Sequence, residues 1–349
     1  MINQIIQEAQ MDARIRFYKI LQFGYYEEKN FCFGSISEVL DNLREWIKDK
    51  TLSETQTYSV DPDDNESDVL STYCYSVTQK DDDFLLITWN QNADVDGKMA
   101  SVNILEKTGE ASVETAEPSD GFIPGYPSFF WFVPSKNVFA TIQFNTSMNG
   151  RKNLEHYLKC FLERQAKYVV YHKENENYNI VGYGSEDDYS MSRYPRFSSV
   201  LYKKNGKIDY IRKNRESIRK FVKKDKLTHE RTEYTDTFQI LFDFLMGKGK
   251  RPTCATENIV NIEIDYKPTE EELENIILKW QQDSVLYPTS DVGFWIEGNS
   301  QPFWLRQSLA SDTFDLDVHF LDKNVLVKPD DLLKELHRKK DIIFKMLET

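Results

Sequence analysis

The densest group of side chains able to do chemistry is a basic segment at residues 203–226. It contains eleven Lys or Arg residues and only three Asp or Glu residues. Lys and Arg are the residues that neutralise the phosphates of a nucleic-acid backbone, so this segment predicts a DNA-binding surface with little sequence preference. We expect the surface to contain Lys203, Lys204, Lys207, Arg212, Lys213, Arg215, Arg219, Lys220, Lys223, Lys224, Lys248, Lys250 and Arg251.

Two local patterns predict how this segment folds. Asn205-Gly206 is a strong signal for a tight β-hairpin, so we expect strands over residues 197–204 and 207–212. A basic helix is then expected over residues 214–224, held to the protein by apolar residues such as Phe221. Its cations would form one stripe for phosphates: Arg212, Arg215, Arg219 and Lys223. The same charges also fit a solvated face, or a match for acidic surface of the same protein.

A second pattern offers a catalytic alternative. Glu263, Asp265 and Lys267 alternate along a predicted strand, which places all three on one face. Two carboxylates can hold Mg²⁺ and the lysine can polarise a phosphate, as in a metal-dependent nuclease. A strand that faces solvent gives the same alternation, however, and no acidic partner strand precedes it.

The overall charge and the histidine and cysteine content limit the functions that the sequence supports. The 349 residues carry a formal net charge of −13, so any DNA contact must come from a minority face. The basic segment would equally suit a protein-interaction or sensor module that binds an acidic protein or anionic lipid headgroups. The five histidines are dispersed and the four cysteines lack Cys-x-x-Cys spacing, so we expect no cofactor, no metal and a reducing cytoplasm. No apolar run is long enough to predict a transmembrane helix.

The predicted core lies away from these charges. Residues 125–133 form a continuous apolar and aromatic run, and residues 138–144 return after a Pro-Ser-Lys-Asn turn. A continuous apolar strand is typical of burial on both faces. A helix with one apolar face is expected over residues 151–164, after Asn149-Gly150.

Together these patterns predict an α+β protein of two mixed domains, with antiparallel sheets and flanking helices. The first, residues 13–165, would contain the apolar hairpin and its helix. The second, residues 166–349, would contain the basic hairpin and helix.

Several of these segments resemble the RexA-like family of phage exclusion (abortive infection) proteins. They are residues 125–132 with the return strand, the helix that ends Tyr157-Leu158-Lys159-Cys160-Phe161-Leu162, the run 260–268 with the helix after it, and the final helix to Met346. They cover about a third of the chain. The resemblance implies non-catalytic DNA binding in phage defence, a homodimer, and a small membrane-protein partner. It carries no base-reading residue across to this chain.

Overall fold

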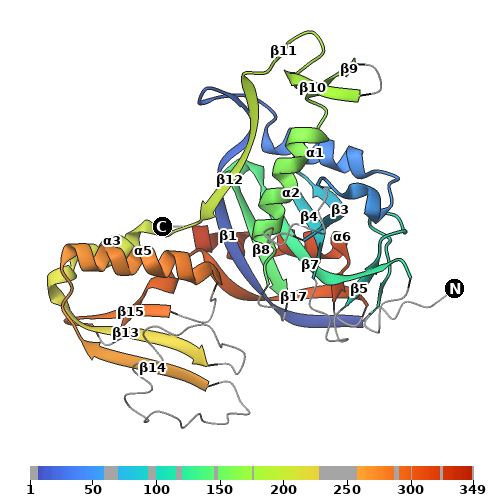
Figure 1. The fold of residues 1–349 in the computed structure, drawn as a ribbon. Coiled ribbons are helices and arrows are strands. Elements are labelled where there is room, and N and C mark those ends of the chain that lie inside the picture. The colour runs from blue at the N-terminus through green and yellow to red at the C-terminus, as the bar shows by residue number, and fades with distance from the viewer. Residues whose placement is uncertain are drawn as a thin grey trace, which may run out of the picture. The chain divides into compact units, whose positions relative to one another are not determined.

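The computed structural model describes residues 7–58, 70–92, 100–114, 120–144, 148–174, 177–227, 258–286, 291–299, 301–322 and 325–347. It contains both helices and strands (Figure 1), and every strand pair within these ranges is antiparallel. The chain divides into two compact units. Unit 1 comprises Met1–Tyr202 with Ala310–Glu348, and unit 2 comprises Lys203–Leu309. The boundary expected near residue 165 falls inside unit 1.

Unit 1 is organised around β1 (Gln7–Glu27), the longest strand described. It pairs with β17 (Ser311–Asp322), β8 (Val138–Phe144), β12 (Arg193–Leu201) and β2 (Asn30–Phe33) along successive parts of its length. The main sheet has the order β18-β17-β1-β8-β7-β4-β3, where the further strands are β18 (Leu326–Val327), β7 (Phe122–Val133), β4 (Asp83–Gln91) and β3 (Thr72–Lys80). The short strand β5 (Ser101–Asn103) pairs with the first residues of β7, and β6 (Val113–Glu114) pairs with β5.

The hairpin β7–β8 confirms the predicted core. Phe130, Trp131, Phe132 and Val133 are each fully buried, so the apolar arm is covered on both faces. Trp131 stacks on Phe344 near the C-terminus, with 5.5 Å between ring centroids. Since neighbouring residues of a strand point to opposite faces, Phe130 packs on the other side of the sheet.

Helices lie on both faces of this sheet (Figure 1). The α1 helix (Ile36–Ile47) begins with a capping box between Ser35 and Glu38, and α2 (Arg151–Arg164) has the predicted limits. On the other face, α6 (Pro329–Arg338) buries three leucines and α7 (Lys340–Phe344) buries Ile343 in the cluster that contains Trp131. Within the described ranges, no helix has the length and apolarity needed to cross a membrane.

Tyrosine hydroxyls donate hydrogen bonds to the backbone carbonyls at the C-terminal end of α2. Tyr25 donates to the carbonyl of residue 162 at 2.7 Å, and Tyr183 donates to that of residue 163 at 3.4 Å. Tyr171 donates to the carbonyl of residue 164. The last carbonyls of a helix have no partner within it, so these bonds satisfy acceptors that would otherwise need water. Two of the tyrosines come from a small sheet of β9 (Val169–Glu174), β10 (Asn177–Gly184) and β11 (Tyr189–Ser190), which is thereby fixed to α2.

A charged cluster holds the C-terminal helices to the start of β4. Asp83 is 1% exposed, and its Oδ2 lies 2.8 Å from Lys340 Nζ and 3.1 Å from His337 Nε2. The same oxygen accepts a 3.1 Å hydrogen bond from Trp131 Nε1. The cluster therefore joins the hairpin core to α6 and α7 through one buried carboxylate.

This cluster predicts a loss of stability in mild acid. Burial is the main cause that lowers the pKa of His337 below 6.5, with Lys340 and Lys80 acting in the same direction and Asp83 and Asp81 opposing them. The unfolded chain therefore binds the proton at higher pH than the folded chain does, and the free energy of unfolding falls as pH drops below about 6.5. Urea unfolding between pH 7.5 and 5 should show this fall, with a smaller pH dependence in His337→Gln. An unchanged dependence in that variant would assign the acid sensitivity to other groups.

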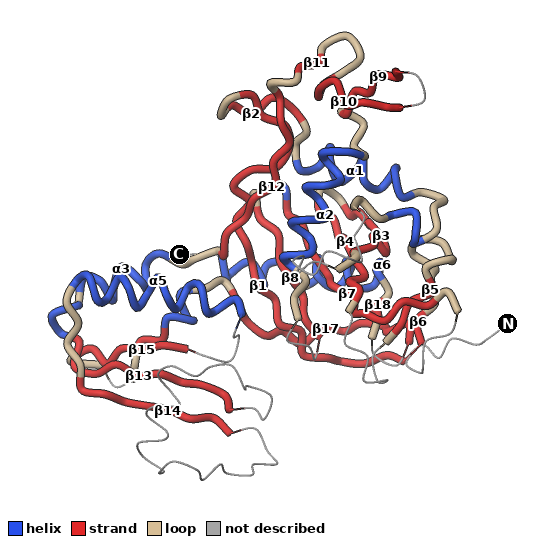
Figure 2. The backbone as a smooth tube through the Cα atoms, in the orientation of Figure 1, coloured by secondary structure: helices blue, strands red, loops and turns tan. Residues whose placement is uncertain are grey.

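The described residues of unit 2 form a smaller antiparallel sheet with the helices α3 and α5 beside it (Figure 2). The sheet order is β14-β13-β15-β16. Its elements in chain order are α3 (Asn205–Lys213), β13 (Ile218–Leu227), β14 (Asn258–Asp265), α5 (Glu270–Leu286), β15 (Asp291–Ile296) and β16 (Phe303–Trp304).

The secondary structure predicted for the basic segment is wrong in two places. The expected hairpin turn Asn205-Gly206 begins helix α3, because Ile208 and Ile211 are three residues apart and bury one helical face. The expected helix over residues 214–224 is mainly strand β13, which forms ladders with β14 on one side and β15 on the other. The helical stripe of Arg212, Arg215, Arg219 and Lys223 therefore does not exist, since these residues lie on three different elements.

Candidate nucleic-acid interface and a groove in unit 1

The structure spreads the predicted DNA-binding residues over unit 2. Lys203 and Lys204 precede α3, which contains the next three predicted cations, and Arg215 lies in a single 3-10 turn. The remaining four described residues of the set, Arg219, Lys220, Lys223 and Lys224, lie on β13. Lys248, Lys250 and Arg251 lie outside the described residues.

Carboxylates of unit 2 pair with much of this basic segment. Arg212 contacts Glu274 of α5 through two bonds of 2.6 and 2.9 Å, and this carboxylate is the main cause of its raised pKa. Arg219 pairs with Glu297, and Lys220 lies 3.5 Å from Glu263. Net charge along the sequence therefore overstates the positive charge that this segment offers to a phosphate. In the described part of the chain, Lys213 and Lys224 have no carboxylate within ion-pair distance.

The two faces of the unit 2 sheet differ in what covers them. Tyr210 of α3 stacks on Phe303 of β16, with 4.7 Å between centroids. Phe303 pairs with the fully buried Phe294, so α3 lies on the face of Phe294. Residues that alternate with these along the strands point to the opposite face.

That opposite face contains two half-buried indole rings beside lysines. Trp295 lies directly across from Lys220, and Trp304 lies across from Gly293. A Cβ atom at Gly293 would lie 3.0 Å from the Trp304 ring, so the ring rests closely on the glycine backbone. We call the surface of Lys220, Lys224, Trp295 and Trp304 the tryptophan face. Asp265 lies across from Lys220 on the same face, and Glu263 lies one pair further along it.

Among the described residues, no hydrogen bond or ion pair joins Glu263, Asp265 and Lys267, the three residues of the nuclease hypothesis, to one another. Glu263 accepts a 3.4 Å bond from Trp295 Nε1 and pairs with Lys220, while Lys267 pairs with Glu216 at 3.1 Å. Asp265 is the last residue of β14, so Lys267 lies beyond the strand. Across the described ranges, no group of three His, Cys, Asp or Glu side chains is placed to hold a metal ion.

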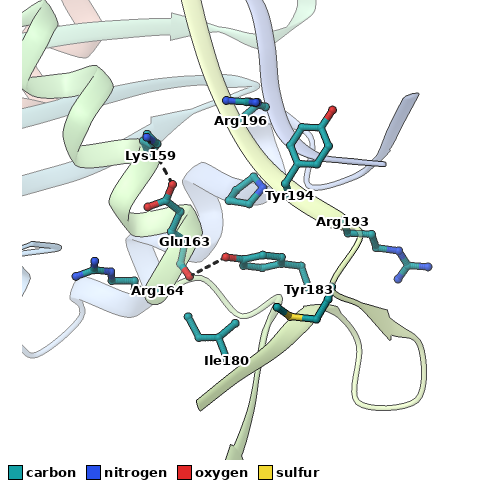
Figure 3. A pocket seen from close by; sticks show the side chains of 10 residues that line it. Lys159, Glu163, Arg164, Ile180, Tyr183, Arg193, Tyr194 and Arg196 are labelled. Carbon is teal, nitrogen blue, oxygen red and sulfur yellow. Dashed lines mark hydrogen bonds and ion pairs between the residues drawn. The ribbon is translucent and has the colours of Figure 1, made fainter. Parts of the chain in front are cut away.

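A groove in unit 1 was not predicted from the sequence. It has a volume of about 430 Å³ and lies between the C-terminal half of α2, β10 and the start of β12 (Figure 3). Polar residues lining it include Lys159, Glu163, Tyr183 and Arg196. Burial is the main cause that raises the pKa of Tyr183, and Glu163 adds to it, so this phenol stays neutral and donates its hydrogen bond.

The cations around this groove differ in how firmly they are held. Arg193 is bound to Asp188 by two 2.9 Å bonds, one to the backbone carbonyl and one to the carboxylate. Arg196 instead lies over the ring of Tyr194, 5.0 Å from its centroid, and no carboxylate of the described residues pairs with it. The side chains of the groove come from one helix, two strands and the turn before β12. Their positions along the chain follow no regular spacing.

No model of a known protein family matches this chain, and a search of curated proteins finds no match.

Proposed function

We propose that unit 2 is a nucleic-acid-binding domain, and that it binds DNA without cleaving it. The observation that supports this most directly is the tryptophan face, where Trp295 and Trp304 lie beside Lys220 and Lys224 on the side of the sheet opposite α3. The phage-defence role, the homodimer and the small membrane-protein partner are proposed on the resemblance to RexA-like proteins alone.

Indole rings and lysines on one face of a sheet suit unpaired strands best. Bases stack on aromatic side chains with about 1–3 kcal/mol per base, whatever their identity, while lysines follow the phosphates. A duplex hides the faces of its bases and offers only phosphates to such a surface. We therefore expect single-stranded DNA to bind more tightly than duplex DNA, with weak sequence preference.

The proposal predicts that binding to a fluorescent single-stranded oligonucleotide depends on both kinds of side chain. Lys220→Gln with Lys224→Gln should reduce the slope of log affinity against log salt by about 1.4, at about 0.7 for each phosphate contact. Trp295→Ala should weaken binding by about 10-fold at every salt concentration, since stacking is not a charge effect. Fluorescence anisotropy at several salt concentrations measures both.

Matched controls separate binding from folding. Lys152→Gln with Lys345→Gln removes two exposed lysines of unit 1 and should leave the salt slope unchanged. Trp295→Phe keeps an aromatic ring and should retain most of the affinity. Wild-type slope and affinity in the Lys220/Lys224 and Trp295→Ala variants would contradict the tryptophan face. Mg²⁺-dependent nicking of plasmid that disappears in Asp265→Ala would support the nuclease instead.

A further inference from the structure

We propose that the groove between α2, β10 and β12 binds a nucleoside monophosphate, with the phosphate at Lys159 and Arg196 and the base beside Tyr183. This site lies wholly within unit 1 and does not depend on the function proposed for unit 2.

Figure 3 shows Lys159 and Arg196 at one end of the groove, and Tyr183 and Ile180 at the other, with Glu163 between them. Arg164 and Arg193 also line the groove, near Ile180 and Tyr183, so what distinguishes the second end is its aromatic ring. Met191 and Pro195 add further apolar lining. A ligand that fits these side chains has a negative group for Lys159 and Arg196 and a flat ring that lies beside Tyr183.

The two cations at the charged end are available to a ligand. The nearest carboxylate to Lys159 Nζ is that of Glu163, at 3.8 Å, which is a loose ion pair. Arg196 contacts an aromatic ring rather than a carboxylate of the described residues. Its planar guanidinium can donate two parallel hydrogen bonds to a phosphate, which makes arginine the preferred residue for this ligand group.

The end of α2 does not repel an anion as an open helix end would. The carbonyls of residues 162, 163 and 164 already accept bonds from Tyr25, Tyr183 and Tyr171. The bond from the Tyr183 hydroxyl also holds its ring against α2, so the aromatic wall of the groove is in place before a ligand arrives. A site ordered in advance loses less entropy on binding.

The volume of the groove argues for a ligand larger than inorganic phosphate. About 430 Å³ lies within the range of small-molecule sites. Phosphate alone would occupy only the end at Lys159 and Arg196 and leave the ring of Tyr183 in water. A nucleoside alone would leave both cations without a new partner. The combination in one molecule is what the lining selects.

Isothermal titration calorimetry with AMP, adenosine and inorganic phosphate tests this proposal. AMP should bind at least about tenfold more tightly than either of the other two. Lys159→Gln and Arg196→Gln should each weaken AMP binding by about 10-fold or more, because each removes a charge-assisted hydrogen bond. Glu163→Gln should tighten AMP binding, since it removes the one carboxylate that lines the groove.

Lys152→Gln is the matched control, because it removes an exposed lysine from the same helix at a position that does not line the groove. It should bind AMP as the wild type does. Arg196→Lys keeps the charge but not the planar fork, and an intermediate affinity is expected. The proposal is overturned if millimolar AMP gives no binding heat, if adenosine binds as tightly as AMP, or if Lys159→Gln and Arg196→Gln keep wild-type affinity while folded by circular dichroism.

Discussion

Replacing Trp131 with alanine is expected to lower the free energy of unfolding by about 3–5 kcal/mol, because it leaves a large cavity in a closely packed core. Trp131 is fully buried between the sheet and the C-terminal helices, where it stacks on Phe344 and contacts the ring of Phe17. The substitution also removes the hydrogen bond from its indole nitrogen to Asp83. Urea unfolding followed by circular dichroism measures the change.

Phe31→Ala is the control for this prediction. Phe31 is also an aromatic residue of a strand in unit 1, but 52% of its surface is exposed. Its replacement should cost far less, because little buried apolar surface is lost. Equal stability of Trp131→Ala and the wild type would mean that the β7–β8 hairpin is not the core of unit 1.

Replacing Asp83 with alanine is expected to destabilise unit 1 by about 3 kcal/mol, because it removes the acceptor of a buried polar cluster. Lys340 and His337 would then face an apolar gap, and the indole N–H of Trp131 would lose its acceptor. The contacts of α6 and α7 with β4 should loosen before the rest of the sheet. Hydrogen exchange of the α6 amides, together with urea unfolding, tests both parts.

Two further variants make this result specific. Asp83→Asn keeps an oxygen acceptor but not the charge, so it should fall between the wild type and Asp83→Ala. Asp81→Ala removes a carboxylate that is 80% exposed and 3.6 Å from His337, and it should have a small effect. If the alanine variants at the two positions are equally stable, the buried cluster does not hold the helices in place.

The parts of the fold that the sequence predicted are those specified by neighbouring residues. In the run before Pro134, apolar residues do not alternate with polar ones, so neither face of the strand is polar. The strand is accordingly buried on both faces. The apolar spacing after Gly150 lies within one helix, and the predicted helix over residues 151–164 formed. In these segments local preference and tertiary packing agree.

The basic segment shows where local patterns fail. Residues 218–227 contain apolar residues at a spacing that fits a helix, yet they form a strand because two partner strands supply hydrogen bonds on both sides. One of these partners, β15, lies far along the chain, and no local pattern indicates it. Asn205-Gly206 makes a hairpin only if the flanking residues pair, and here Ile208 and Ile211 bury a helical face instead.

For the candidate site of unit 2, the sequence predicted the types of residue that take part but not their arrangement. Density of Lys and Arg identified the segment, but the carboxylates that pair with it come from α5, from β14 and from the turn after β15. The tryptophan face depends on the register between β13, β15 and β16, which the sequence does not state. The groove of unit 1 depends on the placement of β10 against α2 and had no sequence signal at all.

The pairing of β1 has a consequence for how the chain is made. Its first residues pair with β17, whereas β8 reaches only from Ala13 onward. A ribosome therefore releases Gln7–Asp12 long before it synthesises their described partner, and such distant pairing slows folding. A chain that stops before residue 311 would expose this stretch of backbone as an unpaired edge, open to the same strand of a second nascent chain.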